Sequence, residues 1–272
     1  MTQLVNVQLN LDNVREIANL GVRRAAVFMG IGLNASQTDP PISHVLGGGM
    51  QFAVVPDDQP AEQQKAFVEE FGRWVIANGF RELTETFSVF LCEVFGGALL
   101  LHQDQIAFSD YQRDLRRFSR LGVSEQLKKA FEKLAIDAPF SVMFETMNDA
   151  RNCMAHRRGV VSTADTDGAE TFVLRWRGLA LTLANGLDIV PWLISGEGFH
   201  TKDGGLLSLG MVDREKAFAV GEPITLTRYD LQEFCLAVQV AAAVVADGLQ
   251  NLAIQKGKLP ATPAAPTPSQ TV

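Results

Sequence analysis

Apolar residues recur every three or four positions over much of this chain, a spacing typical of amphipathic helices. The first such stretch predicts a helix over residues 12–33, which Asp12 or Asn13 is placed to cap. Residues 34–49 carry two prolines and three glycines and are expected to form a loop. The short apolar run at 50–55, closed by the turn sequence PDDQP, is a strand candidate.

A second series of helical patterns begins at residue 61. Residues 61–101 indicate two helices with almost no break between them, and Gly79 is expected to bend this pair rather than end it. Two shorter helices are predicted at 109–121 and 123–136, the second with Ser124 as its N-cap.

Another helix is expected to have Pro139 in its first turn and to run to about Arg158. At ~100° per residue, one stripe of this helix is apolar and consists of Phe140, Met143, Met147, Ala150 and Met154. The opposite stripe is polar and consists of Glu145, Asp149, Asn152 and His156. The apolar stripe should pack into a helical bundle, and the polar stripe should face water or another molecule.

The pattern changes after this helix. Residues 170–183 alternate well enough to predict a strand or hairpin, and residues 223–226 are expected to return as a strand. A long helix follows over 227–255, and Thr227 and Asp230 are placed to form a capping box at its start.

These patterns predict a mainly α protein with a small β insertion, at about 170–226, before the last long helix. Residues 1–60 are expected to form an N-terminal region of helix, loop and short strand, and residues 61–256 a helical domain that contains the insertion. Residues 257–272 are rich in Pro, Ala and Thr and are expected to be a disordered tail.

Composition narrows the class of protein. The chain has 272 residues, of which 47% are hydrophobic, enough for a sizeable core, and a net charge of −7, which excludes a generic binder of nucleic acid or anionic membrane. Three cysteines without a CxxC pair argue against a disulfide framework and a thiolate zinc site, and no two histidines have metal-ligand spacing. The start lacks a signal-peptide pattern, and the apolar runs at 25–33 and 235–249 are too short to span a bilayer. We therefore expect a cytoplasmic protein with no membrane partner, metal or cofactor.

Arg151, Asn152 and His156 form an R-N-x-x-x-H motif in the stretch NDARNCMAHRRGVV, near the end of a predicted helix. The motif resembles the R-x(4–6)-H signature of the HEPN superfamily, in which a polar residue often follows the Arg. The resemblance covers the helical region 61–256 and implies a HEPN-like helical bundle there. Residues 1–60 and the β insertion lie outside what it explains.

The resemblance also implies an activity. Many HEPN proteins are metal-independent endoribonucleases that act as dimers, so it implies RNA as the substrate, a homodimer, and a role as a toxin or antiviral defence effector. It assigns Arg151 to the scissile phosphate, His156 to proton transfer, and Asn152 to orienting the His or the phosphate. In HEPN toxins that a nucleotidyltransferase antitoxin controls, a Tyr stands two positions after the His. Here that position is Arg158, so this type of control is not expected, and an antitoxin or regulatory protein is only a possible partner.

The residue types suit this chemistry independently of the resemblance. RNA carries its own nucleophile, the 2′-hydroxyl, so an enzyme needs only to position it, move a proton and neutralise phosphate charge. A His has an unperturbed pKa near ~6.5 and suits the proton step, and the planar fork of an Arg pairs with two phosphate oxygens. The alternatives are an ordinary solvated helix face and a non-catalytic HEPN-like module that binds a nucleotide or a partner.

One geometric problem follows from the motif. Arg151 lies ~140° around the helix from His156, so the two side chains meet only if the long Arg sweeps round or a second copy of the helix supplies its own set. We therefore expect the polar stripe to lie at or beside a two-fold interface.

Basic residues are concentrated near the motif in sequence. Residues 109–158 hold ten Lys or Arg against seven Asp or Glu, a balance of +3. Candidates for phosphate binding are Arg113, Arg116, Arg117 and Arg120, together with Arg157 and Arg158 after the motif. The alternative is a solvated amphipathic helix whose arginines pair with Asp110 and Asp114.

Overall fold

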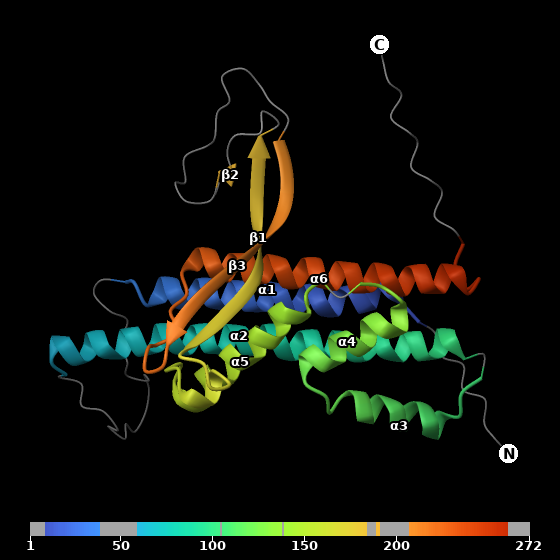
Figure 1. Ribbon diagram of the computed structural model, residues 1–272, viewed down its shortest axis with the longest axis horizontal. Coiled ribbons are helices and arrows are strands. Elements are labelled where there is room, and N and C mark those ends of the chain that lie inside the picture. The colour runs from blue at the N-terminus through green and yellow to red at the C-terminus, as the bar shows by residue number, and fades with distance from the viewer. Residues whose placement is uncertain are drawn as a thin grey trace, which may run out of the picture.

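The computed structural model describes residues 9–38, 59–103, 105–137, 139–183, 189–190 and 207–260. Within these ranges, three long helices lie along the long axis of the molecule (Figure 1): α1 (Leu11–Ala35), α2 (Ala61–His102) and α6 (Arg228–Gln255). The shorter elements are α3 (Phe108–Phe118), α4 (Val123–Leu134), α5 (Ser141–Arg157), β1 (Thr171–Leu183), β2 (Ile189–Val190) and β3 (Leu207–Ala219). The prediction of a mainly α protein with a small β insertion before the last long helix is confirmed.

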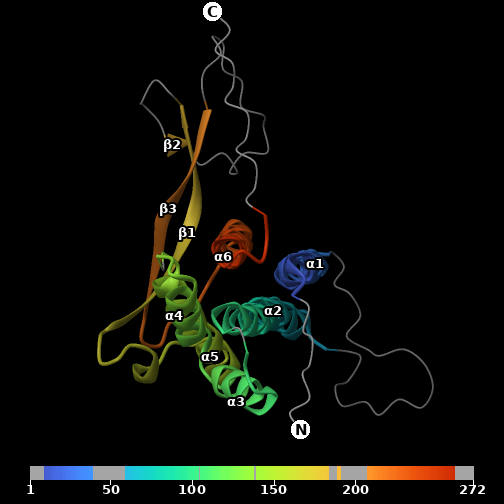
Figure 2. The same cartoon turned by 90° about the vertical axis from the view of Figure 1, so that its right-hand side faces the viewer.

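Helix α2 is the axis of the fold. The two helices expected over 61–101 are one continuous helix, and Gly79 neither ends nor interrupts it. Gly79 faces α1, where a Cβ would lie 2.2 Å from the Sδ atom of Met29, so this glycine allows close packing. Helix α2 contacts each of the other five described helices, and in the end view it lies between α1 and α5 (Figure 2).

The contact between α1 and α2 is unusually close at two further glycines. A Cβ built on Gly21 would lie 2.3 Å from the Cγ2 of Thr86, and one built on Gly32 would lie 2.6 Å from the Cγ2 of Val75. Because residue numbers rise along α1 as they fall along α2, the two helices are antiparallel. The bare backbone at these positions lets them approach closely.

The start of α1 differs from the expectation. The N-cap is Asn10, whose Oδ1 accepts hydrogen bonds from the backbone N–H groups of Asp12 (3.0 Å) and Asn13 (3.2 Å). The two residues expected to cap the helix are therefore inside its first turn. The helical spacing of apolar residues that predicts this helix starts at Val14, so it does not mark Asn10 as the cap.

Two other predicted helix starts are also shifted. The N-cap of α4 is Gly122, and the Oγ–H of Ser124 instead donates to the Oε1 of Glu145 on α5 (3.2 Å). The N-cap of α5 is Phe140, so Pro139 precedes the helix rather than lying in its first turn.

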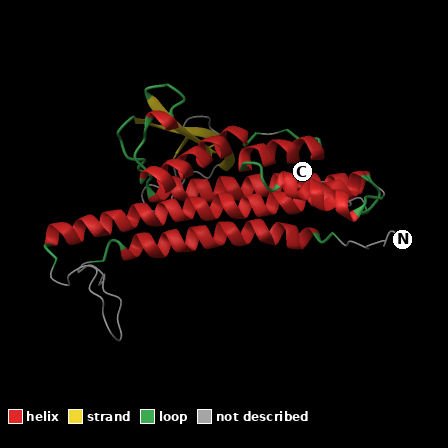
Figure 3. Ribbon diagram, turned by 90° about the horizontal axis from the view of Figure 1, so that it is seen from below, coloured by secondary structure: helices red, strands yellow, loops and turns green. Residues whose placement is uncertain are grey.

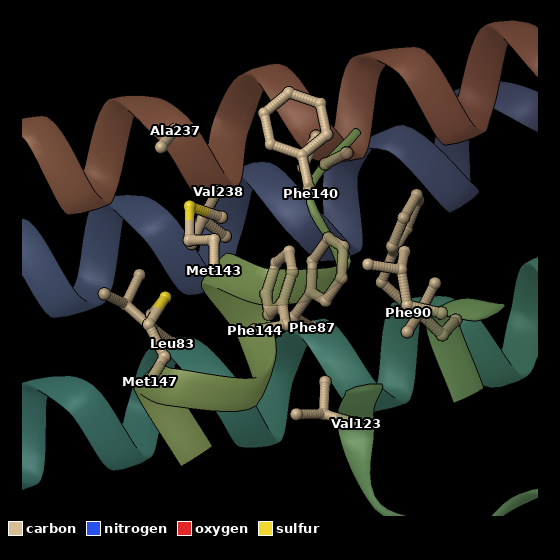
Figure 4. Close-up of a cluster of buried hydrophobic side chains, with 14 of the residues drawn as sticks. Leu83, Phe87, Phe90, Val123, Phe140, Met143, Phe144, Met147, Ala237 and Val238 are labelled. Atoms are coloured by element: carbon tan, nitrogen blue, oxygen red, sulfur yellow. The ribbon is translucent and has the colours of Figure 1, made fainter. Parts of the chain in front are cut away.

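The apolar stripe predicted on α5 packs into the core (Figure 4). The Phe144 ring, from the same side of the helix, stacks on Phe87 of α2 with centroids 4.2 Å apart. The stripe residues Phe140, Met143, Met147 and Ala150 are buried, and Met154 is partly buried. On the opposite side Asp149 and His156 are exposed, and Glu145 and Asn152 are half-buried. The amphipathic pattern therefore predicted the orientation of α5 correctly.

The β insertion is a long hairpin with a short third strand. β1 pairs with β3 in antiparallel register from Thr171↔Ala219 to Leu183↔Leu207, and β2 pairs with the other edge of β1. The expectation of a returning strand at 223–226 is wrong, because Pro223 makes only an isolated bridge to Val160. The returning strand is β3, whose charged sequence DREK concealed the alternation.

The two basic residues of β3 pair with carboxylates in the first turns of α6. Lys216 forms an ion pair with buried Asp230. Asp230 also accepts from the backbone N–H of Thr227 (2.6 Å), and the capping box predicted from these two residues is confirmed. Arg214 lies 3.5 Å from the Oε1 of Glu233, which is 2% exposed.

Glu233 also joins α6 to β1. Its Oε2 accepts from the indole N–H of Trp176 (2.8 Å), and its Oε1 accepts from the backbone N–H of Leu179 (3.1 Å). Gly178 leaves room for this approach, since a Cβ there would lie 2.6 Å from the Glu233 Oε1. Earlier in β1, the Thr146 hydroxyl of α5 accepts from the N–H of Arg175 and donates to its C=O (3.0 Å each).

Two helices, α2 and α6, are long and apolar enough by length and composition to cross a membrane. In each case 56% of the apolar window is buried inside the bundle, and a buried core helix meets the same criterion of length and composition. The predicted strand at 50–55 lies outside the described residues, as does the tail after residue 260.

The close contact of α1 with α2 can be tested with two matched substitutions in α1. Gly21→Ala should lower the free energy of unfolding by about 1–3 kcal/mol, because the new methyl group overlaps Thr86. Gly30→Ala, where nothing lies within 4 Å, should raise it by about 0.5–1 kcal/mol through helix propensity. Urea unfolding measures both values, and equal effects would contradict the close contact.

Removing the buried carboxylate of Glu233 should lower the free energy of unfolding more than removing an exposed carboxylate of the hairpin. Glu233→Ala leaves the Trp176 and Leu179 donors without an acceptor, and each should cost about 1–3 kcal/mol. Glu215→Ala, which removes a surface ion pair with Arg175, should change stability by no more than about 0.5 kcal/mol. Thermal unfolding of both variants is the measurement, and a Glu233→Ala protein as stable as the Glu215→Ala protein would rule out this role.

Candidate functional site

The R-N-x-x-x-H motif occupies the last two turns of α5. The helix ends because Arg158 takes the left-handed conformation (φ 56°) and Gly159 follows with φ 76°. The N–H of Gly159 then donates to the carbonyl of Cys153 (3.2 Å), which closes the helix end. His156 therefore lies in the final turn, on the exposed side of the helix.

Arg151 is held by two oxygen acceptors. Its Nη1 donates to the Oδ1 of Asn152 (3.0 Å), and its Nη2 lies 3.4 Å from the Oε1 of Glu85 on α2. Arg81 lies 3.3 Å from the same carboxylate oxygen. The side chain of Arg151 is 29% exposed and its Nε is buried without an acceptor among the described residues, so the stem packs while the tip reaches the surface.

The Arg side chain sweeps part of the way round the helix. Asn152 and His156 are one turn apart on the same side, and the guanidinium of Arg151 has turned towards that side to reach Asn152. Arg151 and His156 do not bond to each other. No hydrogen bond or ion pair joins the His156 ring to any described residue, which leaves its two ring nitrogens open to a ligand.

Acidic groups precede the motif on the polar stripe. Although Asp149 is exposed as a residue, partial desolvation of its carboxyl raises the pKa, and the nearby charges of Asp167, Glu145 and Asp165 raise it further. A hydrogen bond from Lys128 lowers the pKa of Glu145, whose charge is thereby partly neutralised.

Cys153, inside the motif, is not a nucleophile. Its side chain is buried, and this burial together with the charge of Asp165 raises the pKa of the thiol to about 11. The thiol therefore stays protonated at neutral pH. Among the described residues, no three His, Cys, Asp or Glu side chains come close enough to hold a metal ion.

Arg157, expected to bind phosphate, is paired with a carboxylate of the same chain. Its Nε donates to the Oδ2 of Asp165 (2.8 Å), and its Nη2 pairs with the Oδ1 of the same carboxylate. Asp165, whose side chain is 2% exposed, also accepts from the N–H and the hydroxyl of Ser162 (2.9 Å each). These bonds fix the short 3₁₀ helix Thr163–Asp165 against the end of α5. Arg158 is exposed and pairs with no carboxylate among the described residues.

The arginines of α3 do not join the motif in one patch. Helix α3 packs on α2 through Phe118, which stacks on Phe95 with centroids 4.0 Å apart, whereas Arg151 meets α2 at Glu85. Those two positions of α2 are ten residues apart, or ~15 Å along the helix. Figure 1 likewise shows α3 near the C-terminal end of α2.

The surroundings of the α3 arginines also differ among themselves. Arg113 pairs with Asp110 and Asp114, as expected for a solvated amphipathic helix. The Nε of Arg116 donates to the backbone carbonyl of Gln112 (3.2 Å). Arg117, and Arg120 just beyond the end of α3, make no ion pair with any described residue.

Glu85 is a neighbour of the motif that the sequence did not predict. It is 66 positions from Arg151 and lies in a long helix whose charged residues occur on every exposed side. No local pattern distinguishes it from Glu82 or Glu93. Only the packing of α5 on α2 brings it to the motif.

Comparison with models of known protein families, with curated proteins and with solved structures finds no match to this chain. The likeness to HEPN proteins therefore rests on the motif and on its helical setting.

Asp165 should make the fold sensitive to acid. Burial alone would raise the pKa of its carboxyl, but the bonds from Arg157 and Ser162 outweigh this effect and lower the pKa below its usual value. The stability from this group is thus present above the unfolded pKa of ~3.9 and is lost as the pH falls through the lower folded pKa. Asp165→Asn should cost about 1–3 kcal/mol at pH 7.

The difference between the Asp165→Asn protein and the wild type should shrink below about pH 4. Urea unfolding across the pH range measures it, with Asp167→Asn as the control at an exposed neighbouring position. A difference that does not depend on pH would show that the Asp165 charge contributes nothing.

Proposed function

We propose that this protein is a metal-independent endoribonuclease of the HEPN type. The observation that supports this most is the arrangement at the end of α5. There the Arg151 guanidinium is turned towards Asn152, one turn before the exposed imidazole of His156, which bonds to no described residue. A group that binds phosphate and a group that moves protons thus lie on one accessible helix end.

The proposed reaction uses the nucleophile of the substrate. The 2′-oxygen attacks the adjacent phosphorus, the bond to the 5′-oxygen breaks, and the products are a 2′,3′-cyclic phosphate and a 5′-hydroxyl. His156 takes the proton of the 2′-hydroxyl or supplies one to the leaving 5′-oxygen. Arg151 neutralises the charge that develops on the phosphate oxygens.

Glu85 and Asn152 have separate parts in this proposal. Asn152 keeps the guanidinium turned towards His156 through one nitrogen, Nη1. The contact with Glu85 is long, at 3.4 Å, and its carboxylate is 54% exposed, so it is a weak pair that a phosphate can displace. Glu85 then holds Arg151 in place while no RNA is bound.

The proposal also covers the oligomeric state, the substrate and the cellular role of the protein. A single α5 leaves Arg151 and His156 without direct contact, which supports a homodimer in which the two motifs complement each other. RNA is the proposed substrate, and toxin or antiviral defence activity in the cytoplasm is the proposed setting, under the control of an antitoxin or regulatory protein. A non-catalytic module that binds a nucleotide or partner is the second candidate, which the Glu85–Arg151 pair favours because it occupies the Arg.

Labelled RNA incubated with the purified protein in excess EDTA tests the enzyme. The wild type should cut, and His156→Ala and Arg151→Ala should each abolish or greatly reduce cleavage. The products should end in a 2′,3′-cyclic phosphate. Cleavage that survives His156→Ala or requires magnesium would overturn the proposal, and nucleotide binding without cleavage would support the non-catalytic module.

Stability measurements separate chemistry from folding in the same variants. His156→Ala should change the free energy of unfolding by no more than about 0.5 kcal/mol, because the side chain is exposed. Arg151→Ala should cost somewhat more, because its stem is packed. Met147→Ala should cost about 2–5 kcal/mol, because that side chain is fully buried, yet the folded protein should still cut RNA.

A further inference from the structure

Two arginines from different helices share one carboxylate beside the motif. The Nε of Arg81 on α2 and the Nη2 of Arg151 on α5 lie 3.3 Å and 3.4 Å from the same atom, the Oε1 of Glu85. Two positive charges thus meet one negative charge, which leaves an excess of one positive charge. The side chain of Arg81 is 59% exposed and its two Nη groups bond to no described residue, so they can donate to a ligand.

This arrangement has the form of an anion site that a carboxylate of the protein occupies. Both contacts are longer than the ~2.9 Å of a normal N–H···O bond, so neither arginine is held tightly. An ion pair between exposed side chains is also weak. A phosphodiester has two non-bridging oxygens, one for each guanidinium, so a phosphate that displaced Glu85 would bond to both arginines.

An exposed aromatic ring lies on the same side of α2 as Arg81. Trp74 is seven positions before Arg81, so the two differ by ~20° around the helix and by ~10.5 Å along it. Its indole is 61% exposed, whereas Trp176 is buried in the core. The ring of Phe71 stacks on the indole at a centroid distance of 6.1 Å and an angle of 17°, which limits its orientations. An exposed, oriented indole is a surface on which a nucleic-acid base can stack.

The side of α2 that carries these residues is open to an extended ligand. Figure 3 shows the first half of α2 with no other described helix or strand in front of it. Along the long axis of the molecule, α5 ends level with this first half of α2 (Figure 1), so the motif and Trp74 lie in the same half of the protein. Glu70, one turn before Trp74, is exposed and acidic, so the favourable charge ends there.

We infer that Trp74, Arg81 and Glu85, called the α2 track below, bind the RNA strand beside the motif. Arg81 and Arg151 hold one phosphate, Trp74 stacks on a neighbouring base, and Glu85 occupies the phosphate position until the strand binds. This inference rests on the proposed function, because it extends the same site. It adds two binding residues of α2 that the R-N-x-x-x-H motif does not contain.

The combination of charge and aromatic surface favours a nucleic-acid strand over an apolar protein partner. Proteins that bind single strands place basic side chains along the phosphates and aromatic side chains under the bases. An apolar partner would gain from contact with Trp74, but it would bury the excess positive charge of Arg81 and Arg151 without a counter-charge. The α2 track therefore matches a ligand that is both anionic and aromatic.

Binding of a short 2′-O-methyl oligoadenylate tests the α2 track apart from cleavage, because this probe lacks the free 2′-hydroxyl that the proposed reaction needs. The wild type should bind it, and less tightly as salt rises. Arg81→Ala should weaken binding about tenfold and reduce the slope of log K against log salt by about 0.7, the value for one phosphate on a single strand. Arg23→Ala, which removes an equally exposed, ion-paired arginine from α1, should change neither.

Two further substitutions separate phosphate binding from base stacking. Glu85→Gln should tighten binding several-fold, because it frees both arginines and keeps the shape of the side chain. Trp74→Leu should weaken binding of the oligoadenylate about tenfold, leave binding of an abasic strand of equal length unchanged, and be rescued by Trp74→Phe. Phe108→Ala removes an exposed ring of α3 and should have no effect. Circular dichroism confirms that each variant is folded.

The inference and the proposed activity can fail separately. A wild type that does not bind the probe, an Arg81→Ala protein with an unchanged salt slope, or a Glu85→Gln protein that binds no more tightly would overturn the inference. Equal weakening of both probes in Trp74→Leu would also overturn it, because the ring would then not act through a base. Binding that depends on Arg81 and Trp74 without cleavage of unmodified RNA would support the α2 track and count against the activity. Cleavage that is unchanged in both variants would do the reverse.

Discussion

The close antiparallel contact of α1 with α2 is the constraint on which the other helix positions depend. At Gly21, Gly32 and Gly79 the two backbones approach so closely that a single methyl group would overlap the opposite helix. This contact fixes the rotation of α2 about its own axis. Because α2 contacts every other described helix, that rotation decides which of its residues meet α4, α5 and α6. It also decides that Glu85 faces Arg151.

The hairpin depends on a second constraint, the buried carboxylates at the start of α6. Asp230 and Glu233 are three positions apart and so lie on the same side of the helix, where they meet Lys216 and Arg214, two positions apart on one face of β3. A spacing of three residues on the helix therefore matches a spacing of two residues on the strand, and both pairs of side chains can meet. The hairpin is thereby oriented by ion pairs and hydrogen bonds rather than by apolar packing alone. The segment after β3 bonds in turn to the loop that follows the candidate site, through the N–H groups of Gly221 and Ile224.

Sequence patterns predicted those features that depend on local periodicity. The helical class, the amphipathic orientation of α5 and the capping box at Thr227 all follow from spacings within one element, and the structure confirms them. The returning strand was misplaced because the DREK sequence of β3 hides its alternation. The two basic residues of this sequence pair with carboxylates of α6 that are 14 and 19 positions later in the chain.

The candidate site was predictable only in part, for a similar reason. The motif residues are close in sequence and remain close in the structure, whereas the arginines of α3 are close in sequence but pack elsewhere on α2. Arg157 was expected to bind phosphate, but Asp165 lies within reach only because the chain turns back at Gly159. Charge counted along a segment does not reveal which of its members are already paired.

The capping of β1 by helix side chains bears on how the protein avoids aggregation. An open strand edge offers unpaired N–H and C=O groups to any extended chain. The Thr146 hydroxyl and the Glu233 carboxylate occupy this edge of β1 at Arg175 and Leu179, in the manner of a neighbouring strand. The other edge of the hairpin, on β3, carries a row of alternating charges, which natural sheets use to discourage pairing. A long hairpin can therefore project from a helical body in crowded solution without becoming a template for fibrils.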